Sequence, residues 1–256
     1  MIRGFYTAVA GLISNTARQA VIADNIANVN TPGFKASRTA QSDFELELIR
    51  SAGGPLGPLA TAAVPVGPTL NPAPGMLETT GVATDLAVDG DGLFVVQSAA
   101  GIAYTRAGNF VVDAAGTLTT QTGEPVLGTD GRPIVVPGGA SAFSVGPDGT
   151  VGGTLGATGQ RIALVGWPPG GLERRGGTLF GSPGGGGAPL GPAPVPAPGI
   201  AAPSTIRQGA LERSNVDLAT SMTELVGNQR SLALNARALS IQYETLGEAA
   251  QLGRLR

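Results

Sequence analysis

Acidic side chains are the main groups in this chain that could support acid–base catalysis or metal binding. The sequence contains no His and no Cys, which removes imidazole bases, thiolate nucleophiles, disulfides and most zinc, copper or haem ligand sets. Carboxylate catalysis of the glycosidase kind survives this filter, but sugar clefts need aromatic platforms. Aromatic residues are only 4% of the chain, so we expect no catalytic residue and no enzyme.

One acidic stretch leaves an enzyme interpretation open. Asp43, Glu45 and Glu47 alternate with apolar residues and could supply the paired carboxylates of a cell-wall hydrolase. The same alternation is explained better by a solvated face, and we favour that explanation.

Two glycine-containing motifs resemble parts of ligand sites. Asp89-Gly90-Asp91 resembles the start of a calcium-binding loop, but Leu93 stands where the third oxygen ligand belongs and the twelfth-position Glu is missing. A hairpin turn is the better interpretation. Gly184 to Gly187 lacks the Lys-Ser/Thr and the following helix of a phosphate loop. We expect no metal, no cofactor and no small-molecule substrate.

The charge pattern argues against nucleic acid as a partner. Sixteen basic and eighteen acidic residues leave a net charge of −2. No run of Lys or Arg could follow a phosphate backbone.

Apolar residues near the N-terminus predict an amphipathic helix over residues 2 to about 29. They fit alternating steps of three and four, with Thr16 and Gln19 on the same stripe; the apolar members are Ile2, Phe5, Val9, Leu12, Ala23 and Ile26. The cluster Asn28–Gly33 cannot continue a helix. The amides of Asn25, Asn28 and Asn30 could end the helix or bind a neighbouring chain.

The C-terminal region shows the stronger helical pattern, from Asp217 to about Gln251. A heptad alternation of four and three runs through Leu218, Met222, Leu225, Gln229, Leu232, Ala236, Leu239, Tyr243, Leu246 and Ala250. Ser214 or Asn215 could cap its start. Gln229 is either tolerated in this seam or fixes its register. Such a helix needs a partner, so we expect the two terminal helices to pack together.

The middle of the chain, about 76 to 180, predicts an antiparallel β domain. Short β-type segments are separated by Gly/Asp turns. The expected strands are Asp85–Val88, Leu93–Val96, Ala103–Arg106, Asn109–Val112, Ile134–Val136 and Arg161–Val165.

These patterns predict an α+β protein with three parts. Residues 1–35 and 205–256 form a helical, coiled-coil-like polymerisation module, 36–75 a connector, and 76–204 a β-rich domain. Two Pro/Gly-rich tracts, 53–75 and 181–203, are expected to be linkers or surface loops. The apolar run after Arg3 is too short and interrupted for a signal peptide, so the N-terminal helix is expected to stay on the mature protein.

Three segments resemble the flagellar rod and hook axial proteins. They are Asn25–Lys35, which is a helix end with an Asn-rich turn; Thr84–Phe94 with Tyr104–Phe110 and Asp113–Leu118; and Gln208–Asp217 before the terminal helix, with Gln229-Arg230 beyond it. They occur in the expected order and span most of the chain. Within that family the chain is most similar to the FlgF/FlgG rod class. It departs from the pattern in its rich second Pro/Gly tract and at Leu232–Asn235.

This resemblance implies a structural subunit of the basal-body rod that polymerises helically and transmits torque in bacterial motility. It implies other copies, neighbouring rod and hook proteins and the flagellar type III export apparatus as partners, and a basal-body location reached without a cleaved leader. A non-flagellar or phage-tail filament subunit is the alternative.

The helix faces and the resemblance together give a set of expected subunit-interface residues. In the N-terminal region these are Phe5, Val9, Leu12, Asn25, Ile26, Asn28, Asn30, Thr31, Pro32, Gly33 and Phe34. In the C-terminal region they are Asn215, Val216, Leu218, Met222, Leu225, Gln229, Arg230, Leu232, Leu239, Tyr243 and Leu246.

Overall fold

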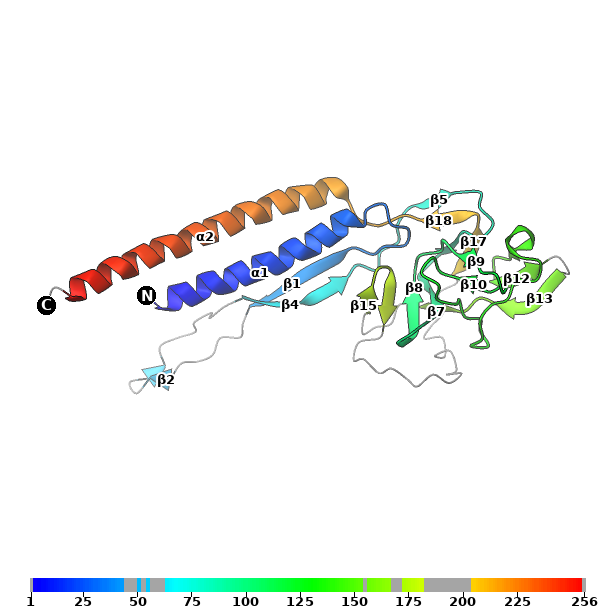
Figure 1. Ribbon diagram of the computed structural model, residues 1–256, viewed down its shortest axis with the longest axis horizontal. Coiled ribbons are helices and arrows are strands. Elements are labelled where there is room, and N and C mark those ends of the chain that lie inside the picture. The colour runs from blue at the N-terminus through cyan, green and yellow to red at the C-terminus, as the bar shows by residue number, and fades with distance from the viewer. Residues whose placement is uncertain are drawn as a thin grey trace. The chain divides into compact units, whose positions relative to one another are not determined.

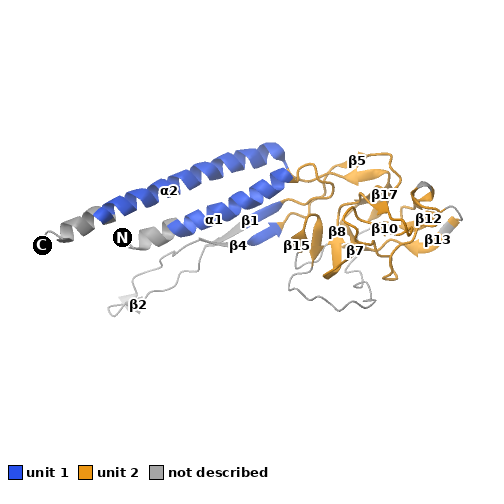
Figure 2. Ribbon diagram, viewed as in Figure 1, with its two compact units in different colours: residues 1–27, 37–69, 217–256 blue, residues 28–36, 70–216 orange. Residues whose placement is uncertain are grey.

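The computed structural model divides the chain into two compact units (Figure 2). It describes residues 2–43, 50–51, 54–55, 63–153, 156–166, 172–181 and 204–254. Unit 1 comprises residues 1–27, 37–69 and 217–256, and unit 2 comprises residues 28–36 and 70–216. Both chain ends therefore belong to the same unit.

Unit 1 is built on the two terminal helices, α1 (Ile2–Ala27) and α2 (Leu218–Arg254). They lie side by side along much of α1 (Figure 1). They run antiparallel, because Arg18 faces Glu224 whereas Gly11, earlier on α1, faces Asn235, later on α2. Among the described residues, neither helix combines the length and apolarity that crossing a membrane requires.

Short strands complete unit 1. β1 (Ser37–Asp43) pairs with β4 (Ala63–Leu70), and β2 (Arg50–Ser51) pairs with β3 (Gly54–Pro55). α1 contacts β1 as well as α2. Because β4 lies within the first Pro/Gly tract, residues 53–75, this tract is not simply a linker. Pro65 and Pro68 are tolerated in β4 because it belongs to a two-stranded sheet, where one edge needs no partner.

A five-stranded antiparallel sheet is the largest element of unit 2. Its order is β14 (Leu164–Gly166), β7 (Gly92–Ser98), β8 (Gly101–Thr105), β16 (Leu179–Gly181) and β15 (Glu173–Gly176). β7 is buried on both faces: Phe94 packs into the main core, and Val95 packs on the other side with Leu127 and Ala163. Burial on both faces explains why Leu93–Val96 is continuously apolar.

Smaller sheets surround that core. β11 (Ser144–Val145), β12 (Thr150–Gly153) and β13 (Gly156–Arg161) form one, and β9 (Val111–Val112) pairs with β10 (Leu118–Thr119). A short 3-10 helix spans Ala140–Ala142. β17 (Thr205–Gln208) pairs with β6 (Leu86–Asp89), and β18 (Ala210–Glu212) pairs with β5 (Leu77–Thr79).

Two expected strands differ in the structure. Ile134–Val136 forms only single bridges rather than a strand, because Pro133 and Pro137 on either side cannot donate ladder hydrogen bonds. The segment Arg161–Val165 is divided between the end of β13 and the start of β14, because Ile162 and Ala163 turn into the core between them.

The unit boundaries also differ from the expected three parts. Residues 28–36 and 205–216 belong to unit 2, because they hydrogen-bond to its strands rather than to the helices. The segment 71–75 joins them there. Most of the second Pro/Gly tract, 182–203, lies outside the described residues, as do Glu45 and Glu47.

Candidate functional site

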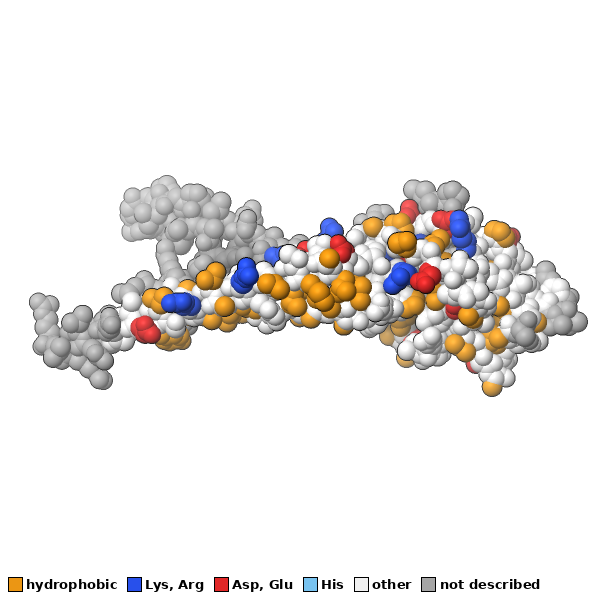
Figure 3. All heavy atoms as spheres, turned by 90° about the horizontal axis from the view of Figure 1, so that it is seen from above, with side chains coloured by type: hydrophobic (Ala, Val, Ile, Leu, Met, Phe, Trp, Pro, Cys, Tyr) orange, Lys and Arg blue, Asp and Glu red, His pale blue; other side chains and the backbone are white. Residues whose placement is uncertain are grey.

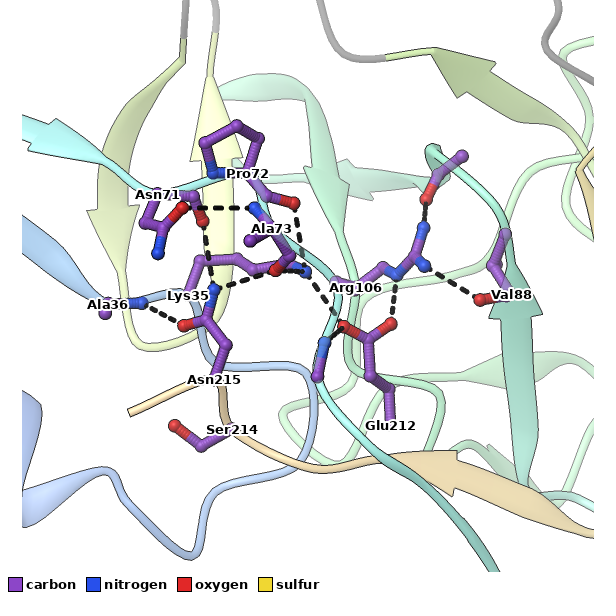
Figure 4. A network of polar contacts seen from close by, with 12 residues as sticks. Lys35, Ala36, Asn71, Pro72, Ala73, Val88, Arg106, Glu212, Ser214 and Asn215 are labelled. Atoms are coloured by element: carbon purple, nitrogen blue, oxygen red, sulfur yellow. Dashed lines mark hydrogen bonds and ion pairs between the residues drawn. The ribbon is translucent and has the colours of Figure 1, made fainter. Parts of the chain in front are cut away.

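A buried group of three charged side chains lies in unit 2 where the segments next to the two helices meet (Figure 4). We call Lys35, Arg106 and Glu212 the ion cluster. Lys35 and Glu212 are each 2% exposed and Arg106 is 4% exposed. The Lys35 ammonium donates to Glu212 Oε1 at 2.8 Å, and Arg106 Nε donates to Glu212 Oε2. One carboxylate therefore bridges two cations from distant parts of the chain.

The remaining hydrogen-bonding groups of the ion cluster find partners on the backbone. Lys35 also donates to the carbonyls of Pro72 (3.4 Å) and Ala73 (2.8 Å). The backbone N–H of Gly75 donates to Glu212 Oε1 at 2.8 Å. A buried charge is tolerated only when it is paired and hydrogen-bonded in this way.

The turn that resembled a calcium loop binds a guanidinium. Arg106 donates to the carbonyl oxygens of Gly92, Gly90 and Val88. The Asp89 carboxylate instead forms a surface ion pair with Arg207, with 2.7 Å between Asp89 Oδ2 and Arg207 Nη2. The carbonyls of this hairpin therefore hold the internal cation of Arg106.

Burial lowers the pKa of the cluster lysine. Loss of hydration lowers the pKa of Lys35 from its ordinary value of 10.5, while the neighbouring Glu212 carboxylate acts in the opposite direction. The net direction is downward, which shows that desolvation outweighs the ion pair.

The Thr31–Phe34 turn packs inside unit 2. Gly33 has φ +67°, and a Cβ added there would lie 2.3 Å from the backbone N of Ala107. Only glycine suits both the positive φ and the close approach. Phe34 is buried, and the Arg174 guanidinium lies 4.1 Å from its ring centroid, which is a cation–π distance.

Asn25 and Asn215, two of the expected interface residues, form hydrogen bonds to the backbone of their own units. In unit 1, Asn25 donates to the Ser37 carbonyl at 2.8 Å and accepts from the Ser37 N–H at 2.9 Å. In unit 2, Asn215 accepts from the Ala36 N–H and donates to the Asn71 and Ala73 carbonyls. The expected cap role of Ser214 or Asn215 was wrong. Asp217 caps α2, because its carboxylate accepts from the Ala219 and Thr220 N–H groups.

In unit 1, the two helices meet through small and polar side chains. Asn228 donates to the Asn15 carbonyl at 2.9 Å, and Asn15 donates to Ser231 Oγ at 3.0 Å. Gly11 lies against Asn235, whose Nδ2 would be 3.3 Å from an added Cβ. We call Gly11, Asn15, Asn228, Ser231 and Asn235 the helix seam. Small side chains here let the helices approach closely.

The expected heptad face of α2 is rotated in the structure. Leu225, Leu232 and Leu239 are half-buried, but Met222, Gln229, Ala236 and Tyr243 are exposed, and Asn228, Asn235 and Gln242 take the inner positions instead. The register role suggested for Gln229 is therefore wrong within the subunit. On α1, Ala23 and Thr16 are exposed, whereas Ser14, Ile22 and Asn25 are buried.

The expected interface residues fall into three groups. Buried within their own unit are Asn25, Gly33 and Phe34. Half-buried are Val9, Leu12, Ile26, Asn28, Thr31, Pro32, Asn215, Val216, Leu225, Leu232 and Leu239. Exposed are Asn30, Leu218, Met222, Gln229, Arg230 and Tyr243, while the side chains of Phe5 and Leu246 lie outside the described part.

Sequence reasoning missed Arg106, Glu212 and Asn228. A signal existed for Glu212, since Ala210 and Glu212 are both inward positions of a short strand and a charge there requires a partner. Asn228 is one residue away from the position that the heptad pattern selected.

Comparison with known proteins places these features in a family. The chain matches the families described as flagellar basal body rod protein (residues 5–35), flagellar hook protein FlgE/F/G D1 domain (87–153) and flagellar basal body rod FlgEFG protein C-terminal (207–252). The flagellar basal-body rod protein FlgG of Bacillus subtilis (strain 168) is 34% identical over 99% of this chain and 100% of its own length.

A similar relation holds for other rod proteins. FlgF of Salmonella typhimurium is 33% identical over 98% of each chain. FlgG of Buchnera aphidicola subsp. Acyrthosiphon pisum is 30% identical over 98% of this chain and all of its own. The three matched regions contain most of α1 with its turn, strands β7 and β8 with Arg106, and Glu212 with most of α2. The chain therefore belongs to the flagellar basal-body rod proteins of the FlgF/FlgG class, and it is a structural subunit of the rod.

Proposed function

We propose that this rod subunit polymerises helically through the outward faces of α1 and α2. The observation that supports this proposal is the exposure of large apolar side chains on both helices. They are Ile13 on α1 and Leu218, Met222, Val226, Leu234, Ile241 and Tyr243 on α2. Figure 3 shows hydrophobic side chains gathered along the helical part, between a few charged groups.

Apolar surface of this kind favours association. Burial of apolar area contributes about 25 cal/mol per Å², and surface patches of this type mark interaction sites. The contact between the helices leaves these exposed apolar residues uncovered, so they remain available for neighbouring subunits. Contacts between different faces that do not close into a ring produce a filament.

The family suggests the partners and the role. We infer that the neighbours are other copies and adjacent rod or hook proteins, and that the assembled helices transmit torque and do not catalyse a reaction. Delivery by the flagellar type III apparatus without a cleaved leader belongs to the same proposal. Retention of the N-terminal segment is supported by the packing of α1 against α2 and β1.

We also propose that the two units have different roles. We assign polymerisation to unit 1, because its helices expose the apolar residues. Unit 2 has a closed core of its own, with buried strands and the ion cluster, and we expect it to fold without neighbours.

Charge substitutions on the outward face test the polymerisation. Leu234 and Tyr243 are 68% and 61% exposed, so Leu234→Asp and Tyr243→Asp should leave the free subunit stable. Each should abolish rod incorporation and motility in a strain lacking its own copy, measured by swimming assays and by electron microscopy of basal bodies.

The matched control is Thr223→Asp, at an exposed polar position of the same helix. It should retain motility. Normal rods in both apolar-face variants would refute the proposal, provided that each variant is expressed at the native level.

A further inference from the structure

We propose that the amides of Asn228, Asn235 and Gln242 determine which helix α2 pairs with and in which register. They recur every seven residues and occupy the inner face of α2, alternating there with half-buried Leu225, Leu232 and Leu239. A seven-residue repeat keeps them on one side of the helix. The inner face is therefore half amide and half leucine.

Asn228 and Asn15 connect the two helices through hydrogen bonds. Asn228 is 5% exposed, and its Nδ2 donates to the carbonyl of Asn15. The side chain of Asn15 in turn donates to Ser231. These bonds connect residues more than two hundred positions apart in sequence. The Asn15–Ser231 bond requires both side chains, so the two bonds occur together in one alignment of the helices.

The other two amides show that this face is not optimised for stability alone. Asn235 packs on Gly11, where any larger residue would approach its amide closely. Among the described residues, the buried Oε1 of Gln242 has no hydrogen-bond partner. A buried amide group without a partner is destabilising. Polar groups at such positions are known to fix register and partner at a cost in stability.

Competing pairings explain why such discrimination is needed. If α2 slid by one heptad, Asn228 would lie opposite Ile22, a buried apolar residue seven positions beyond Asn15, and would lose its bond to Asn15. If the inner face met the apolar outer face of another copy, Asn228 would lose its bond to Asn15 and all three amides would lie against apolar side chains. Only this second argument rests on the proposed function.

Spin-label distances in the full-length chain test the proposal. The native sequence has no Cys, so Ala23→Cys and Thr223→Cys, both at exposed positions, can be labelled selectively and measured by double electron–electron resonance. The otherwise native subunit should give one narrow distance. Asn15→Leu/Asn228→Leu should give a broad or multiple distribution, because a slide of one heptad moves the helix by about 10 Å. Asn228→Leu alone should give an intermediate width.

The matched control is Thr16→Leu/Ser240→Leu, which places the same apolar side chains at exposed positions of the two helices. It should keep the single distance. A broad distribution in the native seam, or an unchanged narrow distance in Asn15→Leu/Asn228→Leu, would overturn the inference. Because the measurement uses the free subunit, it is independent of rod incorporation by the Leu234 and Tyr243 variants.

Discussion

The ion cluster and the helix seam both place polar side chains inside a unit, but those of the ion cluster are charged and those of the helix seam are neutral. In the ion cluster, two cations share one carboxylate and every charge is bonded deep inside unit 2. In the helix seam, neutral amides, a serine and a glycine lie between two helices that leave other large apolar residues exposed. The first arrangement closes the interior of its unit, and the second lies in a unit with apolar side chains on its surface.

The difference follows from the cost of exposing each kind of group. A buried charge that loses its partner is strongly destabilising, so the ion cluster has to stay closed. A neutral amide that loses its hydrogen bond costs less, so the helix pair can separate or shift at a lower cost. If this comparison is correct, substitutions in the ion cluster should destabilise the free subunit far more than substitutions in unit 1.

The largest expected effect is that of Glu212→Gln. This variant keeps the shape of the side chain but leaves Lys35 and Arg106 as buried cations without a counter-ion. Loss of about 3–5 kcal/mol in the free energy of unfolding is expected, measured by urea denaturation. The control is Glu78→Gln, since the pair of Glu78 with Arg213 is more than half exposed and should contribute less than about 1 kcal/mol. Equal losses in both variants would contradict the comparison.

The next effect concerns the turn beside the ion cluster. Gly33→Ala combines a positive φ with a Cβ 2.3 Å from backbone, and the two should together cost about 3 kcal/mol. Gly81 also has a positive φ, of +73°, but nothing lies within 4 Å of an added Cβ. Gly81→Ala should therefore cost only about 1–2 kcal/mol. Thermal and urea unfolding of the two variants separate backbone strain from the clash.

A smaller, local effect is expected at the start of α2. Hydrogen bonds from Thr220, followed by the Ala219 N–H, lower the pKa of Asp217. Its stabilising effect is therefore present above the unfolded value of 3.8 and is lost as the pH falls through the lower folded pKa. Asp217→Ala should speed amide hydrogen exchange at Ala219 and Thr220 near neutral pH. Unchanged exchange there would show that another group caps the helix.

The smallest effect is a pH dependence from the ion cluster. Burial places the folded pKa of Lys35 below 10.5, so the unfolded chain binds more protons as the pH approaches that value. The contribution of this group to stability should therefore rise with pH up to about 10.5. Lys35→Met removes this contribution. The stability of the native protein relative to this variant should increase between pH 8 and 10, and a flat or falling difference would contradict the assigned direction.

Local sequence patterns predicted where the helices and strands lie, and long-range contacts determined which of their faces are buried. The helix α2, the apolar run of β7 and the end of α1 before Asn28–Gly33 appear where the sequence predicted them, because each depends on neighbouring residues. The phase of the helix faces was wrong, because apolar periodicity assumes that large residues face the partner within the subunit. Here Asn228, Asn235 and Gln242 alternate with half-buried leucines on the inner face, while Met222 and Tyr243 are exposed.

The ion cluster could not be derived from spacing. Lys35 and Glu212 are 177 positions apart, and neither stands in a motif that specifies the other. The segment 205–216 was assigned to the helical module, because three- and four-residue strands give little periodicity. Their pairing with β6 and β5 depends on strands more than a hundred residues earlier.

The long segment of unit 2, residues 70–216, has its two ends bonded to each other. The Asn215 side chain donates to the Asn71 carbonyl at 3.2 Å, and the Arg213 N–H donates to the Met76 carbonyl at 2.8 Å. The strands between these points can therefore be lengthened, shortened or exchanged while the spacing of the two ends stays fixed. Insertions and deletions in the β-rich part can therefore accumulate during evolution while the flanking segments keep their sequence and position.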